Sequence, residues 1–504
     1  MSANSETAAR PTDTGFAIIG AGMGGILMAI KLKEAGFHDF VILEKGDRVG
    51  GTWRENTYPG LHCDFPSHFY SYSFFQNPNW THRFSPGPEI RDYLESAAHA
   101  FGVFDAIRFN SKVTDGRWDD DAWTVTLEGG ETLRAGVLIA ATGYLHVPNF
   151  PEIEGLANFA GKQFHTAQWD HSVALADKRI GIIGTGSTST QLVAELFGKV
   201  KHLSVFQRTP QWVVQQDNPA FSEEEKAAFA ADPALLAKMY NDAKAEMIAL
   251  ADGAILGGNA DARAYLVSNV EANLARVQDP DLRRKLTPDY APGCKRIVIS
   301  PRFYEAIQHP DASLVTEPIT RVEPQGIRTE DGALHALDVL VLATGYDTQA
   351  YFRPLDLHGE GGTPIAEVWR ERPVAFRTMT VPKMPNFFIV EGPFSPIGNV
   401  CAFLTAELQV GHIIKLIRVI TGRNVALSPR EDATAALLET YREAARTTIW
   451  ATGGCVSWYQ DVDGVPTLYP FANQVFEAEM TADPDLAEYV VWPRRAGTMA
   501  GAMA

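Results

Sequence analysis

A glycine-rich turn that joins an apolar strand to a helix occurs twice in this chain, once near its start and once in its middle. The first turn contains Gly20, Gly22 and Gly25, and the second contains Gly184 and Gly186. Glycines at these spacings allow a tight turn and let the backbone approach a pyrophosphate, whose charge is stabilised by the start of the following helix. The sequence therefore predicts an α/β fold with two Rossmann-like dinucleotide-binding domains.

The residue that follows the second strand of each unit indicates which nucleotide each domain binds. Glu44 ends that strand in the first unit, and Arg208, followed by Thr209, occupies the same register position in the second. A carboxylate accepts hydrogen bonds from a ribose hydroxyl, whereas a guanidinium pairs with a 2′-phosphate through two parallel hydrogen bonds. We therefore expect FAD in the first domain and NADPH in the second, the alternative being that Arg208 is a solvated side chain at a strand end. The last position of the second motif is Ser189, where the pattern has glycine or alanine. This is a mild departure from the pattern.

The order of the elements predicts a discontinuous FAD domain. Two apolar segments, 137–143 and 339–345, both end in Ala-Thr-Gly, which marks where the chain passes between the domains. Helix-forming sequence between them, with a capping box at Ser222 and Glu225, predicts a helical insertion. The expected parts are a flexible N-terminal lead (1–15), the first part of the FAD domain (16–147), the NADPH domain (148–346) with its insertion (about 218–292), and the rest of the FAD domain with the C-terminal segment (347–504).

Composition excludes several classes of partner. The 44 Lys and Arg residues against 61 Asp and Glu residues give a net charge of −17, which disfavours nucleic acid or an anionic membrane surface as the main partner. The apolar run 16–30 is interrupted by glycines and too short to span a bilayer. The four cysteines show no paired spacing, so we expect neither a disulfide framework nor a metal site, and a protein of the reducing cytoplasm.

A flavin and an NADPH domain in one chain support three chemistries: disulfide reduction, activation of oxygen, and electron transfer to a partner. Flavin disulfide reductases need two closely spaced cysteines beside the flavin, and the first half of this chain contains only Cys63. No iron–sulfur or haem spacing is present. Oxygen is therefore the favoured electron acceptor.

A fingerprint between the two glycine-rich motifs resembles that of a known family. The segment 159–170 matches FxGxxxHxxxW(P/D), the fingerprint of type I Baeyer–Villiger monooxygenases, through Phe159, Gly161, His165, Trp169 and Asp170. Further resemblances run along nearly the whole chain, including Gly50-Gly51-Thr52-Trp53, Tyr58-Pro59-Gly60, Gly293-Cys294-Lys295-Arg296 and Ser457-Trp458-Tyr459. The chain is identified on these motifs as a member of that family.

The resemblance implies a reaction and its catalytic residues. The family uses NADPH to reduce FAD, adds O2 at the flavin C4a atom, and inserts one oxygen atom next to the carbonyl of a small-molecule ketone to give an ester or lactone. By position, Arg296 matches the catalytic arginine and Asp64 the carboxylate that orients it. A guanidinium suits this role because it stabilises negative charge and cannot act as an acid near neutral pH. The alternative is a structural ion pair.

We expect further cofactor contacts from residues in these motifs. For the FAD domain they are Gly51, Thr52, Trp53, Asp64, Tyr70 and Val113, and for NADPH they are Thr185, Ser187, Thr188, Gln191, Thr209, Lys295 and Trp458. Lys295 could instead be a surface lysine, and Trp458 a packed one. His165 is expected to act as a hydrogen-bonding hinge rather than a base, and Trp169 as either core packing or an interdomain latch.

Two other functions stay open on the sequence alone. One is a flavin monooxygenase that oxidises nitrogen or sulfur, against which the Trp169-Asp170 ending argues. The other is a catalytically silent nucleotide sensor, against which Asp64 and Arg296 argue. We expect a monomer or small homo-oligomer, and the motifs do not indicate which ketone is the substrate.

Overall fold

A computed structural model describes residues 13–119, 121–398 and 400–495. Most of the predicted N-terminal lead lies outside these residues. The expected boundary at residue 15 is wrong by a short margin, because the first strand, β1 (Thr14–Ile19), begins two residues before the apolar run. Thr14 and Gly15 are held there by hydrogen bonds to Asp39, which extend the pairing of β1.

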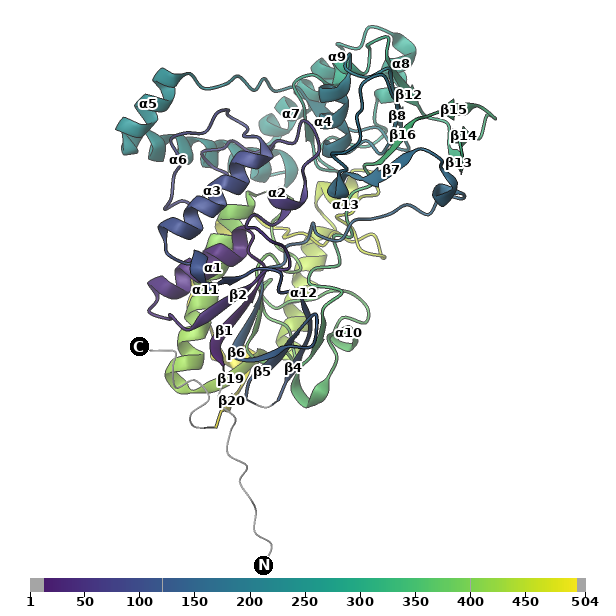
Figure 1. Cartoon of the computed structure of the whole chain (residues 1–504). Helices are drawn as coiled ribbons and strands as arrows, with labels where there is room; N and C mark the ends of the chain where they lie inside the picture. Colours follow the sequence, from purple (N-terminus) through teal and green to yellow (C-terminus); the bar gives the residue numbers. More distant parts are fainter. Residues whose placement is uncertain (1–12, 120, 399, 496–504) are drawn as a thin grey trace, which may run out of the picture.

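The first sheet takes its strands from both ends of the chain and forms the lower part of the molecule in Figure 1. Its order is β17-β4-β5-β6-β1-β2-β3, and β18 also pairs with β6. The strands are β1, β2 (Phe40–Leu43), β3 (Ile107–Arg108), β4 (Val113–Trp118), β5 (Trp123–Leu127), β6 (Thr132–Ala140), β17 (Asp356–His358) and β18 (Phe387–Ile389). Phe16 and Ile18 pack into one apolar cluster and Ala17 and Ile19 into another, since alternate residues of a strand face opposite sides of a sheet.

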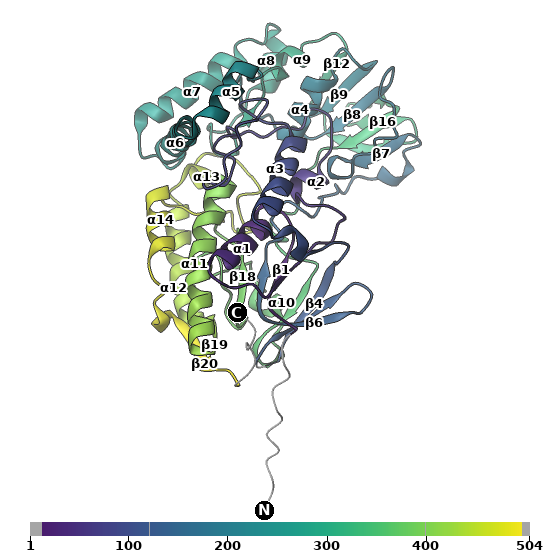
Figure 2. The same ribbon diagram turned by 60° about the vertical axis from the view of Figure 1, so that its left-hand side comes forward.

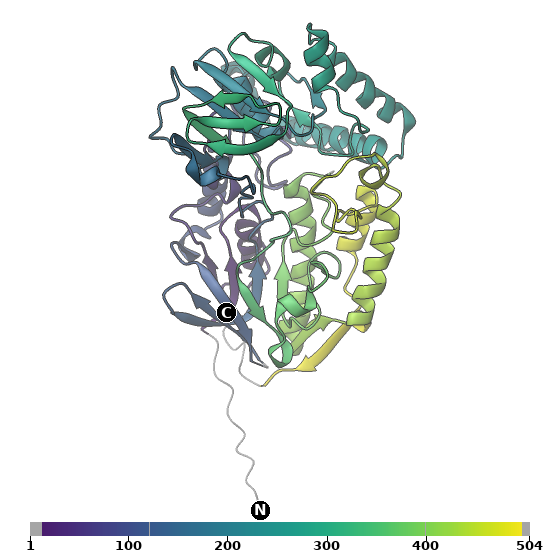
Figure 3. The same cartoon turned by 90° about the vertical axis from the view of Figure 1, so that its right-hand side faces the viewer.

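Helices cover one face of this sheet. They include α1 (Met23–Glu34), α3 (Gly87–Ala100) and the long α11 (Ala402–Arg423), which packs along α1. Figures 2 and 3 show α11, α12 (Glu431–Ala445) and α14 (Asn473–Thr481) side by side in green to yellow, with β19 (Val425–Pro429) and β20 (Tyr489–Pro493) at their lower end. The first glycine-rich unit is therefore completed by residues from the last quarter of the chain.

The second sheet contains the second glycine-rich unit. Its order is β12-β9-β8-β16-β7, and all neighbours are parallel. The strands are β7 (Lys162–His165), β8 (Arg179–Ile183), β9 (His202–Phe206), β12 (Ala312–Val315) and β16 (Val339–Leu342). Helices α4 (Ser187–Leu196) and α9 (Phe303–Ala306) accompany it, with a meander of β13 (Ile319–Glu323), β14 (Gly326–Thr329) and β15 (Leu334–Ala336).

Helices replace the α/β alternation between β9 and β12, the third and fourth strands of that sheet in chain order. They are α5 (Glu223–Ala231), α6 (Pro233–Leu250), α7 (Ala260–Leu274) and α8 (Pro280–Leu286). The capping box predicted at Ser222 and Glu225 is present at the start of α5. Tyr240 of α6 packs edge-on against Phe69, with ring centroids 5.5 Å apart, so these helices also contact the first part of the chain.

The remaining elements are short. The helices are α2 (Thr52–Glu55), α10 (Ile365–Val368), α13 (Ile449–Thr452) and a π-helical turn (Ala251–Ile255); the strands are β10 (Val213–Val214) and β11 (Val298–Ile299); and 3₁₀ turns occur at Phe104–Ala106, Leu156–Asn158, Thr166–Gln168, Glu360–Gly362 and Leu486–Glu488. In the described ranges, none of the helices combines the length and the apolar character that crossing a membrane would require.

Candidate active site

One large cavity receives the carboxyl ends of strands from both sheets. It is lined by both glycine-rich turns and by the two Ala-Thr-Gly segments that follow β6 and β16. Every residue predicted to be catalytic or to bind a cofactor lines this cavity except Gly25. Ligands of open parallel sheets bind at this edge, so the position itself favours nucleotides.

The first glycine-rich turn forms a cradle that side chains would fill. Gly20 has φ +103°, and a Cβ there would lie 2.7 Å from the carbonyl oxygen of Ala141. A Cβ on Gly22 would lie 3.4 Å from the Cα of Gly51, which faces it across the turn. Gly25 is turned away from the cavity, where a Cβ would collide with the carbonyl of Gly20, so its role is to bring α1 onto β1. The cradle therefore fits a bound pyrophosphate.

Glu44 is held rigidly beside this cradle. Its carboxylate accepts hydrogen bonds from the amides of Ala21 (2.8 Å) and Gly46 (2.7 Å) and from Arg54 (2.7 Å). The side chain is buried and at the same time lines the cavity. These three donors hold the acid where a ribose hydroxyl would lie.

The second cradle is more open. Gly184 has φ +117° and packs against the Ala343 carbonyl, whereas a Cβ on Gly186 would meet nothing within 4 Å. The hydroxyl of Thr185 donates to the carbonyl of Thr209 (2.8 Å), which connects the glycine-rich turn to the end of β9. Ser187 and Thr188 begin α4 and line the cavity. Ser189 is buried, so this departure from the motif is accommodated in the helix packing.

Two cations face the cavity beside the second cradle. Arg208 is exposed, and Lys295 lies near enough that its pKa is lowered by burial and by the charge of Arg208. Within the described part of the chain, neither side chain has an acidic partner within ion-pair distance. Lys295 instead lies over the ring of Tyr290, 5.0 Å from its centroid. Two neighbouring cations without a carboxylate partner form a site for a dianion such as a phosphate.

Arg296 and Asp64 form a two-pronged ion pair at the junction of the two sheets. Nε of Arg296 donates to one carboxylate oxygen (2.9 Å) and Nη2 donates to the other (2.7 Å). Burial tends to raise the pKa of Asp64, but the charge and hydrogen bonds of Arg296 outweigh it and keep that pKa below its usual value. Burial likewise opposes the charge of Arg296, and Asp64 overcomes this, so the pKa of Arg296 is well above normal. Both groups therefore stay charged, and Asp64 fixes the orientation of the Arg296 guanidinium in the cavity wall.

Gln191, a predicted cofactor contact, also connects two parts of the cavity wall. It lines the cavity, and its amide oxygen accepts a hydrogen bond from Tyr58 (2.8 Å) and its nitrogen donates to the carbonyl of His62 (3.0 Å). Because Gln191 lies on α4 and the other two lie in the loop before Asp64, it links the two glycine-rich units. Sequence reasoning did not identify this link, although the Tyr58-Pro59-Gly60 motif marks its position.

Aromatic side chains enclose the cavity near Asp64. Trp53 donates from its indole to the hydroxyl of Tyr70 (3.2 Å), and their rings meet edge to face. Thr52 and Gly51 come directly before Trp53 at the start of α2, while Val113 contributes an apolar wall from β4. On the opposite side, Trp458 is 39% exposed and stacks on Tyr144, with centroids 6.3 Å apart.

The fingerprint residues lie outside the cavity. His165 is fully buried at the end of β7 beside the ring of Tyr346, and burial lowers its pKa. Trp169 is half-buried and packs edge-on against Phe164, with ring centroids 4.9 Å apart. Asp170 accepts two hydrogen bonds from Ser172. Phe159 and Gly161 precede β7, where a Cβ on Gly161 would meet the ring of Phe159.

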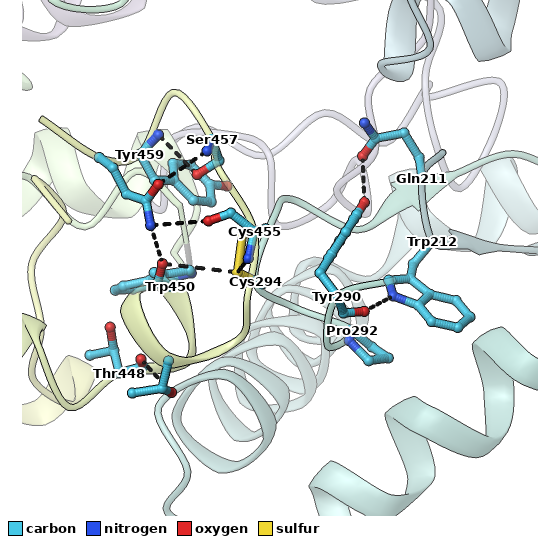
Figure 4. The surroundings of a disulfide bond; sticks show 12 residues. Gln211, Trp212, Tyr290, Pro292, Cys294, Thr448, Trp450, Cys455, Ser457 and Tyr459 are labelled. Atoms are coloured by element: carbon cyan, nitrogen blue, oxygen red, sulfur yellow. Dashed lines mark hydrogen bonds between the residues drawn. A yellow bond between two sulfur atoms is a disulfide. The ribbon is translucent and has the colours of Figure 1, made fainter. Parts of the chain in front are cut away.

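Cys294 and Cys455 form a disulfide, shown in Figure 4. The expectation that no cysteines pair is therefore wrong. Their Cα atoms lie 6.0 Å apart although 161 residues separate them in sequence, which is why spacing alone gave no sign of the bond. Because Arg296 follows Cys294 by two residues and Trp458 follows Cys455 by three, the bond joins two segments that both contribute to the cavity wall.

We expect the Cys455→Ser variant to lose about 2–5 kcal/mol of stability, because a cross-link that closes a long loop restricts the unfolded chain. Thermal unfolding with and without a reductant measures this effect. The melting temperature of the wild type should fall on reduction toward that of the variant, and that of the variant should not change. Equal melting temperatures for both proteins under oxidising conditions would contradict the prediction.

Two dinucleotide cradles that open on one cavity define a two-nucleotide oxidoreductase. A family model described as pyridine nucleotide-disulphide oxidoreductase matches residues 17–248. A Baeyer–Villiger monooxygenase of Streptomyces coelicolor is 38% identical over 94% of this chain and 92% of its own length. An uncharacterized monooxygenase of Mycobacterium tuberculosis is 47% identical over 90% of this chain and 92% of its own.

Solved structures show the same relationship. The closed crystal structure of cyclohexanone monooxygenase matches with a TM-score of 0.83 and 31% identity, over 96% of this chain and all of the other. A crystal structure of OTEMO in complex with FAD and NADP matches with a TM-score of 0.85 and 26% identity over the same shares. The chain belongs to the Baeyer–Villiger monooxygenases, NADPH-dependent flavoprotein oxidoreductases. The assignment made from the fingerprint and the predicted two-domain α/β fold are both confirmed.

Proposed function

We propose that this chain uses FAD and NADPH to insert one oxygen atom of O2 next to the carbonyl of a small-molecule ketone, giving an ester or lactone. The observation that carries this proposal is the half-buried pair of Arg296 and Asp64, which lines the same cavity as the two cradles. When bound, FAD supplies the chemistry that activates oxygen, and NADPH supplies the electrons. In this proposal the protein acts in the cytoplasm as a monomer or small homo-oligomer; because disulfides are uncommon in that compartment, the bond between Cys294 and Cys455 removes the cysteine-based argument for this location.

The domains divide this work in the proposal. Segments 16–147 and 347–504 bind FAD through the first cradle, Glu44, Thr52, Trp53, Tyr70 and Val113. Segment 148–346 binds NADPH through the second cradle, Arg208 and Lys295, and Trp458 encloses the nicotinamide end. Gln191 and the disulfide connect the FAD-binding and NADPH-binding parts. The connection of the chain between these two parts contains the fingerprint residues Phe159, Gly161, His165, Trp169 and Asp170.

The polar residues of the site perform the step through charge and position. Arg296 stays protonated at neutral pH, so it can stabilise negative charge on oxygen without donating a proton to it. Asp64 fixes the plane of the guanidinium through two hydrogen bonds. The rings of Trp53, Tyr70 and Tyr144 line the same cavity as Arg296, and apolar surface of this kind lowers the local dielectric constant and so strengthens electrostatic stabilisation.

A substrate panel tests the proposal. Cyclic, linear, aryl and steroid ketones are incubated with the purified enzyme, FAD, NADPH and isotopically labelled oxygen. One labelled atom should appear in an ester or lactone, with matching consumption of NADPH. Products formed only from amines or sulfides would support the nitrogen- and sulfur-oxidising alternative, and the absence of any oxygenated product would contradict both.

FAD should be bound tightly and without a covalent bond. Purified protein is expected to be yellow and to release its flavin into the supernatant on acid precipitation. Gly20→Ala should give largely colourless protein, because Gly20 has positive φ and a Cβ there would meet the Ala141 carbonyl. Gly129→Ala is the matched control, since Gly129 has φ +98° with nothing within 4 Å of its Cβ position. Colour that stays in the acid pellet, or equal flavin content in both variants, would contradict the prediction.

A further inference from the structure

Glu391 is a buried acid that the proposed mechanism does not use. It follows β18 and lines the cavity together with Ile397 and Val400, and 7% of its surface is exposed. Its Oε1 atom has no hydrogen-bond partner within the described ranges. A buried carboxyl without a partner is costly, so the fold tolerates it here at the expense of stability.

The backbone of Glu391 is fixed although its side chain is not bonded. Its amide donates to the side-chain oxygen of Gln409 (2.8 Å), whose nitrogen in turn donates to Thr378 (2.6 Å) and Ser395 (2.9 Å). Glu391 also has φ +58°, a conformation that non-glycine residues adopt uncommonly. The loop is therefore built to hold this carboxyl in one place.

Glu391 lines the cavity near the first glycine-rich turn and near Tyr144. On one side its neighbour Val390 packs against the start of α1, where a Cβ on Gly24 would lie 3.0 Å from the valine Cγ1. On the other side its charge interacts with Tyr144, which in turn interacts electrostatically with Arg296. The carboxyl therefore belongs to the reacting end of the cavity.

Burial favours the protonated form of Glu391. Burial raises its pKa to about 8, so the carboxyl carries a hydrogen that it can donate. The titratable groups that interact with it directly are Tyr144, from the segment after β6, and Cys401, at the start of α11. Burial raises the pKa of both groups well above that of Glu391, and beyond Tyr144 the charges of Arg296 and Asp64 are paired with each other. Glu391 is therefore the group among these that titrates near pH 8.

We propose that Glu391 is a further ligand-binding residue, which donates a hydrogen bond to a carbonyl oxygen of a molecule in the cavity. The inference rests on the proposed function, which supplies two carbonyl compounds to this site: the flavin ring of FAD and the ketone substrate. Both offer the same acceptor chemistry. The same fixed donor would orient whichever carbonyl reaches it.

Two substitutions and one control test this proposal. Glu391→Gln keeps a donor that does not titrate, whereas Glu391→Leu removes hydrogen bonding. Glu407→Gln is the matched control, because Glu407 is a half-buried acid of the adjacent helix α11 that already accepts hydrogen bonds from the amide and hydroxyl of Ser73, away from the cavity. Each protein is measured for FAD affinity of the apoprotein, for the absorbance spectrum of bound FAD, and for the KM of ketones, below and above pH 8.

The two carbonyl sources give different results. If the partner is the flavin, Glu391→Leu should weaken FAD binding about tenfold and shift the spectrum of bound FAD, with little change in ketone KM. If the partner is the ketone, its KM should rise about tenfold with unchanged FAD affinity. In the wild type, FAD affinity should fall above pH 8 in the first case, and the ketone KM should rise above pH 8 in the second, because the carboxyl loses its proton. In Glu391→Gln the same quantity should not change with pH.

Stability distinguishes ligand binding from a structural role. Glu391→Leu apoprotein should unfold at or above the wild-type temperature, because an unpaired buried acid has been removed. A less stable variant, or unchanged FAD and ketone binding in Glu391→Leu, would overturn the inference. A wild type that oxidises no ketone would instead refute the proposed function, and the FAD measurements alone would then decide the role of Glu391.

Discussion

Arg296→Ala is expected to lower the rate of ester or lactone formation about 100- to 1000-fold, the usual cost of removing a preorganised charge from a reacting site. The guanidinium is held against Asp64 by two hydrogen bonds and keeps its proton at all physiological pH values. Insertion of oxygen next to a carbonyl builds negative charge on oxygen. Among the arginines of the described cavity wall, Arg296 holds Asp64 with two parallel hydrogen bonds, whereas Arg54 donates one to Glu44, beside the first cradle.

Arg296→Lys should recover little of this loss. A lysine keeps the positive charge but replaces the planar two-pronged contact with a single mobile ammonium, so Asp64 can no longer fix its direction. Electron transfer from NADPH to FAD develops no such oxygen anion, and its rate should decrease less than the rate of product formation. Anaerobic stopped-flow reduction, compared with aerobic product analysis on the same variants, separates the two half-reactions.

Arg302→Ala provides the matched control for Arg296. Arg302 also makes a two-pronged contact with a carboxylate, that of Glu305 at 2.9 and 3.1 Å, but the pair is exposed and lies outside the cavity. Its loss should leave both half-reactions unchanged, since exposed ion pairs contribute little. Near wild-type product yield from Arg296→Ala would show that the assigned role is wrong.

Local sequence patterns predicted the two nucleotide cradles, but they could not predict that Asp64 and Arg296 lie next to each other in the cavity wall. The turns at Gly20 and Gly184 could be identified because strand, turn and helix are consecutive in sequence. Asp64 and Arg296 are 232 residues apart, and only the resemblance to a family connected them before the fold placed them within 3 Å of each other. The spacing of residues within a short motif cannot predict a contact between residues so far apart in sequence.

The features that sequence reasoning missed depend on burial and on distant pairing. Glu391, followed by Gly392 and Pro393, reads as an ordinary turn, and only the packing of α11 and β18 shows that its carboxyl is enclosed. The bond between Cys294 and Cys455 has the same origin, because its partners are brought together by the docking of the C-terminal segment. A resemblance to a family identifies the residues of its motifs. Glu391 lies outside those motifs, and the spacing of Cys294 and Cys455 gives no sign that they pair.

Arg208→Ala is expected to raise the KM for NADPH about 10- to 100-fold and to leave the KM for NADH nearly unchanged. A charge-assisted hydrogen bond to a phosphate contributes about 1.5–3 kcal/mol, and only NADPH carries the 2′-phosphate that this arginine would bind. Arg208 lacks an acidic partner in the described structure and lowers the pKa of Lys295 by its charge, so the two side chains form a positive site that a dianion would relieve.

Ionic strength and a double variant sharpen the Arg208 experiment. The KM for NADPH should rise with salt in the wild type and more weakly in Arg208→Ala, since screening acts on the contact that the variant has lost. Adding Lys295→Ala should cost less than the sum of the two single losses if both side chains bind one phosphate, because neighbouring contacts to a shared group are not additive. Steady-state kinetics with both coenzymes measures all of these effects. Equal losses with NADPH and NADH would show that Arg208 supports the fold of the strand end rather than the choice of coenzyme.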